Sequence, residues 1–302
     1  RGSDLGVLLY GSHVTAAHAI VDEPLTRLRV LSANIQAGAR TDSYRDYVTR
    51  PWTHVLPHPQ KQGSLYSLEH RLRLIAEIGI DLCIVVNFSR NFAGIKAEDF
   101  IKHILAGKIN AKYVYVGNDF RFGRNTEGKI SLLKKLGRIY DFKVKGFKIV
   151  KSSNNPISST LIRSLIKNGE IKRAGELLDR PVSILGTVIK GTALGRILGF
   201  PTANINPHHE VIPARGIYAV KVILGEKRLK GVCYIGRRPT IVRHAKKINI
   251  EVYIFNFKNN IYGKYLEIQF IEMIRKDEKF SSLGLLAEQI KKDVSLAKKI
   301  LS

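Results

Sequence analysis

The spacing of apolar residues changes once along this chain of 302 residues, and the change limits the folds that the chain can adopt. From residue 65 to about residue 178, continuous apolar runs alternate with segments in which apolar residues recur every three or four positions. Asp81–Phe88 is typical of a buried parallel strand, and Ile130–Tyr140 has the spacing of an amphipathic helix. This alternation predicts an α/β domain around a parallel sheet, which we place at 64–180.

After Pro181 the pattern contains strands with no helices between them. The expected strands are Ser183–Ile189, Gly216–Leu224, Leu229–Ile235, Ile248–Phe255 and Tyr265–Phe270, and Leu283–Leu301 is the clear helix of this part. Many short strands separated by turns predict an antiparallel barrel. We therefore expect a second domain at 181–302.

Residues 1–63 differ in composition from the rest of the chain. Lys61 is the only lysine among them, and they are rich in Arg, Ala, Thr and His, whereas Ile and Lys are common from Ser64 onward. So abrupt a shift indicates a different origin and predicts an atypical, poorly packed segment at 1–63. No run approaches the roughly 20 apolar residues that span a bilayer, so we expect no membrane partner.

The two cysteines, Cys83 and Cys233, lie far apart in apolar runs and lack the spacing of a zinc site. Cysteines in such runs are typically reduced residues of the core. Because no secretory signal is evident either, the sequence predicts a cytoplasmic protein.

The formal charge of +25 fits a protein that binds nucleic acid, one that attracts small anionic substrates, or one from a lysine-rich proteome. The tightest basic cluster is Arg237, Arg238, Arg243, Lys246 and Lys247, in an expected loop. No alternation of aromatic and basic residues indicates an RNA-binding sheet. The pattern favours a solvated basic surface that attracts nucleotides, without a specific nucleic-acid partner.

A glycine-rich stretch, Gly191–Asn204 (GTALGRILGFPTAN), lies near the start of the expected barrel. Its glycines, which let a backbone approach a phosphate closely, are Gly191, Gly195 and Gly199. Thr202 and Asn204 are two residues apart, so in an extended segment their oxygens point the same way and suit Mg²⁺, which also takes nucleotide oxygens. The spacing alone fits at least as well a barrel corner in which Thr and Asn cap a turn.

Alternation in Ile248–Phe255 places Glu251 on the opposite face from the isoleucines and valine of the same strand. A carboxylate in mid-strand is unusual unless its face is wet or functional. A kinase that acts on an alcohol can use one carboxylate to accept the hydroxyl proton. An ordinary solvent-facing glutamate fits the pattern equally.

These segments together resemble the riboflavin kinase family. The matching motifs, in the family's order, are GTALGRILGFPTAN at Gly191–Asn204, RGIYAV at Arg215–Val220, YIGRRPT at Tyr234–Thr240, IEVYIF at Ile250–Phe255, YGKYL at Tyr262–Leu266 and RKDEKF at Arg275–Phe280. The resemblance implies a six-stranded barrel with a C-terminal helix. It also implies transfer of the γ-phosphate of ATP to the ribityl 5′-hydroxyl of riboflavin, which gives FMN.

The resemblance also implies roles for particular residues. Thr202 and Asn204 are expected to hold Mg²⁺, and Glu251 to be the catalytic base. The loop that contains Gly191, Gly195 and Gly199 is expected to cover the nucleotide phosphates, and Arg275 to lie on the flavin side. Tyr234 and Tyr253 depart from the family, in which Asn and His are commoner at these positions.

The middle of the chain resembles the FMN adenylyltransferase domain of prokaryotic bifunctional riboflavin kinase/FAD synthetases. Its motifs are LYSLEHRLRLIAEIGID at Leu65–Asp81, GNDFRFG at Gly117–Gly123 and ISSTLIR at Ile157–Arg163. The resemblance implies a Rossmann-like sheet that binds nucleotide at Gly117 and Asp119 and at an expected helix start. The helix-start residues are Ser158, Ser159, Thr160 and Arg163. Free N–H groups there can bind a polyphosphate, although an ordinary Ser/Thr helix cap fits the pattern without the resemblance.

This family also has a Gly-x-Phe-Asp-Gly-x-His-x-Gly-His loop after its first strand, and the chain lacks it. In the nearest string, Gly11–His18 (GSHVTAAH), the histidines are five residues apart and no Asp precedes them at the spacing of the family's loop. Leu28–Pro57 instead resembles the opening of endonuclease/exonuclease/phosphatase-family proteins, of whose metal-site residues only Asn34 has a counterpart. We therefore expect no nuclease activity, an incomplete adenylyltransferase sheet and impaired FAD synthesis.

The sequence thus favours an enzyme that uses ATP, Mg²⁺ and riboflavin or FMN. Two other classes remain open on the sequence alone. A basic nucleic-acid-binding protein fits the charge of +25, and a flavin-binding module without turnover fits the kinase motifs. The oligomeric state is left open.

Overall fold

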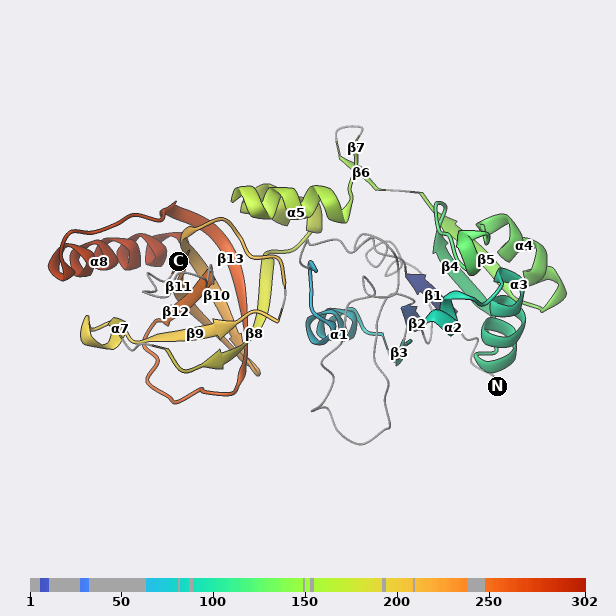
Figure 1. Cartoon of the computed structure of the whole chain (residues 1–302), viewed down its shortest axis with the longest axis horizontal. Helices are drawn as coiled ribbons and strands as arrows, with labels where there is room; N and C mark the ends of the chain where they lie inside the picture. Colours follow the sequence, from blue (N-terminus) through green and yellow to red (C-terminus); the bar gives the residue numbers. More distant parts are fainter. Residues whose placement is uncertain are drawn as a thin grey trace. The chain divides into compact units, whose positions relative to one another are not determined.

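The computed structural model describes residues 6–10, 28–32, 64–80, 82–86, 89–148, 150–152, 155–191, 194–208, 210–237 and 248–302. The described part divides into two compact units (Figure 1). One, the sheet unit, is formed within 1–61 and 71–159, and the other, the barrel unit, within 62–70 and 160–302. The barrel unit therefore includes two segments, 64–70 and 160–180, that the apolar pattern assigned to the α/β domain.

The sheet unit is built on five parallel strands in the order β3-β2-β1-β4-β5. The strands are β1 (Gly6–Tyr10), β2 (Leu28–Ser32), β3 (Leu82–Val85), β4 (Tyr113–Gly117) and β5 (Lys143–Phe147). The predicted α/β class is confirmed. The expectation of an incomplete sheet is wrong, because β1 and β2, both from within residues 1–63, pair into it and β1 lies at its centre. These strands are only four or five residues long. Strands this short leave a weak apolar pattern, so β1 and β2 were not predicted from residues 1–63.

Helices follow the strands of the sheet unit as the pattern predicted. They are α1 (Leu68–Glu77, which begins in the barrel unit), α2 (Arg90–Ala93), α3 (Ala97–Asp99), the π-helix η4 (Phe100–Lys108), the 3-10 helix η5 (Arg124–Thr126) and α4 (Ile130–Ile139). A two-stranded hairpin, β6 (Lys151–Ser152) and β7 (Asn155–Pro156), follows. Ile101, Leu105 and Leu133 pack with Val114 and Val116 of β4 in one apolar core.

The barrel unit is a closed antiparallel barrel in the strand order β10-β11-β12-β9-β8-β13, which confirms the predicted six-stranded architecture (Figure 1). Its strands are β8 (Val182–Ile189), β9 (Thr202–Asn206), β10 (Gly216–Leu224), β11 (Lys227–Arg237), β12 (Ile248–Ile254) and β13 (Tyr265–Lys276). Pairing of β13 with β10 closes the barrel. Alternate residues fill its interior: Ile250, Val252 and Ile254 are at most 5% exposed.

Among the described residues, the barrel unit has four helices besides the start of α1: α5 (Ser159–Asn168), α6 (Ile171–Leu178), α7 (Leu194–Ile197) and the long C-terminal α8 (Leu283–Ile300). Ser282 caps α8, because its hydroxyl accepts a hydrogen bond from the Leu285 N–H. Val294 and Ala297 of α8 pack on Ile217 and Val232, so α8 covers part of the outer face of the barrel. Among the described helices, none is long and apolar enough to cross a membrane.

The two cysteines are free. Cys233 is buried in β11, as predicted, and burial raises the pKa of its thiol. Cys83 in β3 is only partly buried. The sequence therefore predicted the reduced state of both cysteines but overestimated the burial of Cys83.

Candidate functional site

Three predicted site residues meet on neighbouring strands at the outer face of the barrel. Glu251 of β12 pairs with Asn204 of β9, and two positions further along these strands Tyr253 pairs with Thr202. The Thr202 hydroxyl donates a hydrogen bond of 2.9 Å to Glu251 Oε2. Although 49 positions separate these two residues in the sequence, the strand register places the expected metal ligands and the expected base side by side.

The carboxylate of Glu251 accepts a second hydrogen bond, which was not predicted from the sequence. Asn249 Nδ2 donates to Glu251 Oε1 at 2.6 Å, from the same strand and the same face. Each carboxylate oxygen thus has its own donor. The signal was present as Asn-x-Glu in an alternating strand.

The glycines of the preceding loop leave room for these side chains. A Cβ at Gly191 would overlap the side-chain amide of Asn204, and a Cβ at Gly195 would overlap the Phe200 carbonyl and lie 3.1 Å from Thr202 Oγ1. Gly199 makes no such contact and has a φ of +83° in the turn that follows α7. Gly191 and Gly195 are therefore required by close approach to the two expected metal ligands.

The residues present fit Mg²⁺. The Thr202 hydroxyl and the Asn204 amide are neutral oxygen donors on one strand face, and such donors suit a magnesium ion that keeps water and phosphate ligands. Asn204 is 5% exposed, and the missing side chain of Gly191 leaves the space in front of its amide. Thr202 and Asn204 are the residues that could hold the ion.

Tyr234 of β11 lies opposite Glu251 in the strand register. Burial, together with a hydrogen bond and the negative charge of Asp277, raises the pKa of Tyr234 to about 12. The phenol is therefore protonated near neutral pH and adds no charge beside the carboxylate. Tyr253, the other departure from the family pattern, packs edge-on against Phe200 at a centroid distance of 5.4 Å.

Arg275, the expected flavin-side residue, is bonded to α8. Its Nε and Nη2 donate to both oxygens of the buried Asp293 at 2.8 to 3.1 Å, and its Nη1 donates to the Lys276 carbonyl at 3.2 Å. The guanidinium also lies 5.5 Å from the centre of the Phe280 ring. These contacts give Arg275 a structural role at the junction of β13 and α8, and its contact with flavin stays a prediction.

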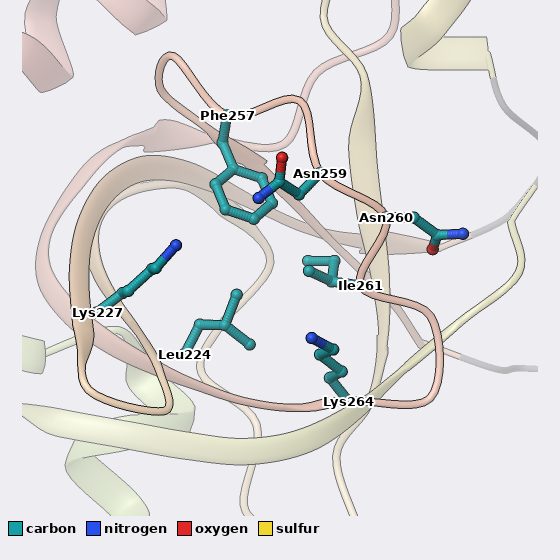
Figure 2. A pocket seen from close by; sticks show the side chains of 7 residues that line it. All are labelled: Leu224, Lys227, Phe257, Asn259, Asn260, Ile261 and Lys264. Atoms are coloured by element: carbon teal, nitrogen blue, oxygen red, sulfur yellow. The ribbon is translucent and has the colours of Figure 1, made fainter.

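A cavity of about 210 Å³ lies between the β10–β11 turn and the β12–β13 connection of the barrel (Figure 2). The residues that line it are Leu224, Lys227, Phe257, Asn259, Asn260, Ile261 and Lys264. Lys264 precedes β13, and its carbonyl accepts a 3.0 Å hydrogen bond from Val188 of β8. No predicted site residue is among the seven.

The residues expected to bind nucleotide for adenylylation lie at element ends. In the sheet unit, Gly117 ends β4, and a Cβ there would lie 2.8 Å from Oδ1 of Asp119 in the following turn. Ser158 and Ser159 lie at the start of α5, with Ser159 buried. The strand-end and helix-start positions agree with those predicted from the motifs.

Two further members of that motif, Thr160 and Arg163, belong to the barrel unit. Thr160 is exposed and Arg163 is partly buried, one helical turn later. Burial lowers the pKa of Arg163, and its Nε has no hydrogen-bond partner among the described residues. A guanidinium with a free donor can accept an anionic ligand.

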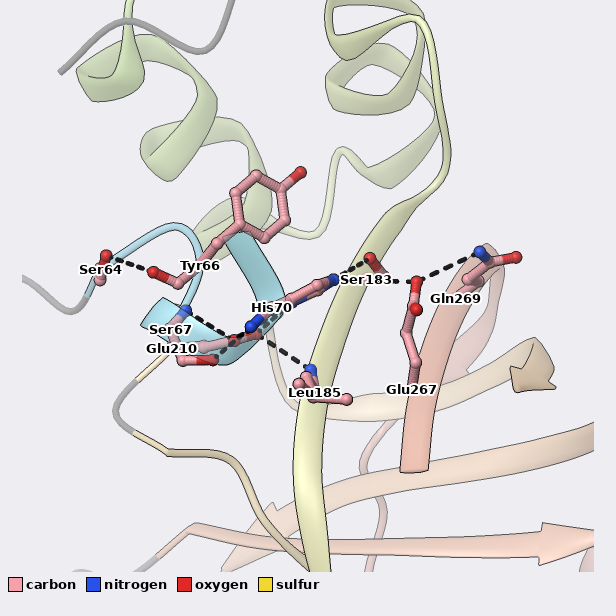
Figure 3. Close-up of polar contacts among 9 residues, drawn as sticks. All are labelled: Ser64, Tyr66, Ser67, His70, Ser183, Leu185, Glu210, Glu267 and Gln269. Carbon is pink, nitrogen blue, oxygen red and sulfur yellow. Dashed lines mark hydrogen bonds and ion pairs between the residues drawn. The ribbon is translucent and has the colours of Figure 1, made fainter. Parts of the chain in front are cut away.

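A buried polar cluster in the barrel unit was not predicted (Figure 3). His70 of α1 is fully buried, with Nδ1 at 3.1 and 3.0 Å from the two carboxylate oxygens of Glu210. Its Nε2 lies 3.2 Å from the Ser183 hydroxyl and 3.7 Å from a carboxylate oxygen of Glu267. Since 140 positions separate His70 from Glu210, no local pattern could have shown this contact.

Several residues discussed from the sequence lie outside the described residues. They are His13, His18, Asn34, Pro57 and the basic loop residues Arg238, Arg243, Lys246 and Lys247. Of Arg237 only the backbone, at the end of β11, is described. The predictions made for these residues stay predictions.

Comparison with known families matches both halves of the chain. The riboflavin kinase family model matches residues 178–301, and the FAD synthetase family model matches residues 46–161. The second match starts upstream of residue 63, within the stretch compared above with the endonuclease/exonuclease/phosphatase family. That nuclease-like resemblance receives no support from these matches.

Curated relatives share both activities in their names. The "Bifunctional riboflavin kinase/FMN adenylyltransferase" of Buchnera aphidicola (subsp. Schizaphis graminum) is 40% identical over 237 residues, which cover 78% of this chain and 76% of the relative. The proteins of the same name from Escherichia coli K12 and Bacillus subtilis are 38% and 33% identical, covering 76% and 80% of this chain and 73% and 77% of their own lengths.

A solved structure is similar over nearly the whole chain. It is described as the crystal structure of a macrolide-efflux protein from Streptococcus pneumoniae and has a TM-score of 0.75 at 26% sequence identity. The similarity covers 99% of this chain and 95% of that one. The two-part architecture therefore occurs in a crystal structure.

Proposed function

Because the chain belongs to the bifunctional riboflavin kinase/FMN adenylyltransferase family, we propose that it phosphorylates riboflavin with ATP at Glu251, Thr202 and Asn204, and that it converts FMN to FAD only slowly. The kinase reaction is riboflavin + ATP → FMN + ADP. The observation that carries the proposal is the hydrogen bond between Thr202 and Glu251, which joins the expected metal ligand to the expected base. The free cysteines fit a reducing compartment such as the cytoplasm.

Glu251 is the group that orients the attacking alcohol. Its carboxylate is held by Thr202 and Asn249 and is partly exposed on the outer face of the barrel. An oxygen held in this way accepts a hydrogen bond from the ribityl 5′-hydroxyl and takes its proton as the O–P bond forms. The leaving group is ADP.

Thr202 and Asn204 are the residues that would hold Mg²⁺. When bound, the ion neutralises charge on the transferring phosphoryl group. The Thr202 hydroxyl donates a hydrogen bond to Glu251, so the lone pairs of its oxygen are available to a cation. The backbone around Gly191 and Gly195 lies close to these side chains and can approach the ATP phosphates.

The adenylyltransferase reaction, FMN + ATP → FAD + pyrophosphate, is proposed to be slow for a chemical reason. Two histidines three residues apart stabilise the phosphates in this family, whereas the histidines of Gly11–His18 are five residues apart and no Asp precedes them at the spacing of the family's loop. Gly117, Asp119 and the helix start at Ser159 are still present for nucleotide binding. A site that binds the nucleotide but stabilises the transition state poorly keeps most of its affinity for the nucleotide and loses most of its rate of FAD formation.

The test of the kinase site is Glu251→Gln, which keeps the shape of the side chain and removes its basicity. We expect kcat for FMN formation to fall roughly 10²-fold or more, with KM for riboflavin and ATP little changed. Glu226→Gln, in the exposed β10–β11 turn, is the matched control and keeps the wild-type rate. A near-wild-type rate for Glu251→Gln removes Glu251 from its role.

The charge of +25 favours one other class, a nucleic-acid-binding protein. Such a protein retains DNA at physiological ionic strength with a steep salt dependence. We expect any DNA binding to vanish near about 0.15 M salt, because salt at that concentration screens the unspecific attraction between the basic surface and the DNA phosphates. DNA retained tightly at that salt concentration supports the other class.

A further inference from the structure

The carboxylate of Glu251 is fixed from two sides. Thr202 lies on β9 and donates to Oε2 at 2.9 Å, whereas Asn249 lies on β12 and donates to Oε1 at 2.6 Å. The strand register accounts for the first contact, and side-chain alternation along β12 accounts for the second. The two donors act on different oxygens, so together they define the plane of the carboxylate.

From this geometry we infer that Asn249 is a positioning residue of the proposed kinase reaction, holding Glu251 in the orientation in which it accepts the proton of the substrate alcohol. The inference rests on the proposed function. A terminal carboxylate rotates broadly about its last bond unless it is held. Loss of the Asn249 amide leaves the Thr202 hydroxyl as the donor to Glu251 and lets the freed oxygen turn away from the alcohol.

Asn249 does not serve the barrel core. The residues on either side of Asn249 in β12 differ in burial. Ile250 is 1% exposed and lies inside the barrel, whereas Ile248 is 41% exposed. Asn249 lies on the outer face and is partly exposed. A residue that acts only by packing would affect stability, whereas a residue that acts through Glu251 affects the rate only while Glu251 is a carboxylate.

This difference gives a test by double-mutant cycle. Purified full-length wild type, Asn249→Ala, Glu251→Gln and the double variant are compared for FMN formation from riboflavin, ATP and Mg²⁺. We expect Asn249→Ala to lower kcat about 10-fold with KM little changed, the scale for losing one hydrogen bond to a charged group. In the Glu251→Gln background the same change should cost less than about 2-fold, because there is no longer a base to orient.

Two further variants exclude a folding defect. Asn249→Asp keeps the side-chain shape but replaces the donor by a carboxylate that repels Glu251, so we expect it to fold and to lose at least as much rate as Asn249→Ala. Asn206→Ala, an exposed asparagine of β9, is the matched control and keeps the wild-type rate. Circular dichroism melting reports whether each variant is folded.

The outcomes separate the inference from the proposed function. A wild-type rate in Asn249→Ala, or an equal loss in both backgrounds, overturns the positioning role while the kinase assignment stands. Asn249→Asp as fast as the wild type also overturns it. A Glu251→Gln variant as fast as the wild type overturns both, because there is then no base to position.

Discussion

Replacing His70 by leucine removes an imidazole that lies within 3.0 Å of the Glu210 carboxylate and 3.7 Å of the Glu267 carboxylate, both buried in the barrel unit (Figure 3). The side chains of His70 and Glu210 are 0% exposed and that of Glu267 is 4% exposed. Leucine fills a similar volume, so the change acts mainly on charge. Arg180 is a further described cation on this side of the barrel unit, with its guanidinium 4.9 Å from the centre of the Tyr66 ring.

The titration of the cluster gives the prediction its sign. Burial alone lowers the pKa of His70, but hydrogen bonds to Glu210 and Glu267 and their charges outweigh burial and raise the pKa above its ordinary 6.5. Burial likewise raises the pKa of Glu267, and the contacts with His70 outweigh it and lower the pKa below 4.5. The contribution of His70 to stability is thus complete below pH 6.5 and is lost as pH rises through the folded-state pKa. That of Glu267 is complete above pH 4.5 and is lost as pH falls.

The expected loss of unfolding free energy depends on the hydrogen bonds that Glu210 and Glu267 keep without His70. In His70→Leu, Glu210 still accepts hydrogen bonds from the N–H groups of Ser67 and Leu185, and Glu267 still accepts one from Gln269. Breaking a buried ion pair typically costs about 3–5 kcal/mol, and these remaining donors place the expected loss near the lower end. We expect about 3 kcal/mol less free energy of unfolding in the variant at about pH 6.

The assay is urea denaturation of full-length wild type and variants, followed by circular dichroism between about pH 5.5 and 8.5. In the wild type the free energy of unfolding falls as pH rises above 6.5, with a slope of up to about 1.4 kcal/mol per pH unit, and His70→Leu lacks this component. His103→Leu, at an exposed position of η4, is the matched control and changes stability by less than about 0.5 kcal/mol. A pH slope in His70→Leu equal to that of the wild type refutes the reasoning.

Two further predictions test contacts around the proposed kinase site. Gly191→Ala drives a methyl group into the Asn204 amide and should lower the FMN-forming rate at least about 10-fold, whereas Gly284→Ala, which has room on α8, should not; equal rates in steady-state assays contradict the close approach. Arg275→Lys exchanges a forked contact with Asp293 for a single point charge and should lower the free energy of unfolding by about 1–3 kcal/mol. An unchanged urea midpoint contradicts a structural role for Arg275.

Much of the barrel could be predicted because its information is local. Alternation along Ile248–Ile254 placed Glu251 on the outer face, and the motif placed Thr202 and Asn204 on one side of an extended segment. The strand register then brought the three together as a consequence of barrel closure. The length of β13, which runs to Lys276, was underestimated because its outer half is only partly buried and lacks a clean alternation.

The parts that could not be predicted depend on partners far away in sequence. The buried contacts of His70 could not be predicted because its carboxylate partners lie on β13 and in the segment after β9. The ion pair of Arg275 with Asp293 could not be predicted because it forms only when α8 docks on the barrel, and the expected place of Arg275 on the flavin side stays a prediction. The strands β1 and β2 were missed because five-residue strands carry a weak pattern, and their pairing with β4 and β3 decides their structure.

The most direct test of the proposed function is chromatography of the flavins formed when the purified chain is incubated with riboflavin, ATP and Mg²⁺. We expect FMN to accumulate and FAD to follow at a much lower rate, because the kinase residues are brought together whereas the paired histidines of the adenylyltransferase loop are not in the sequence. FAD formed as fast as FMN contradicts the proposed impairment. No FMN from folded protein contradicts the kinase assignment itself.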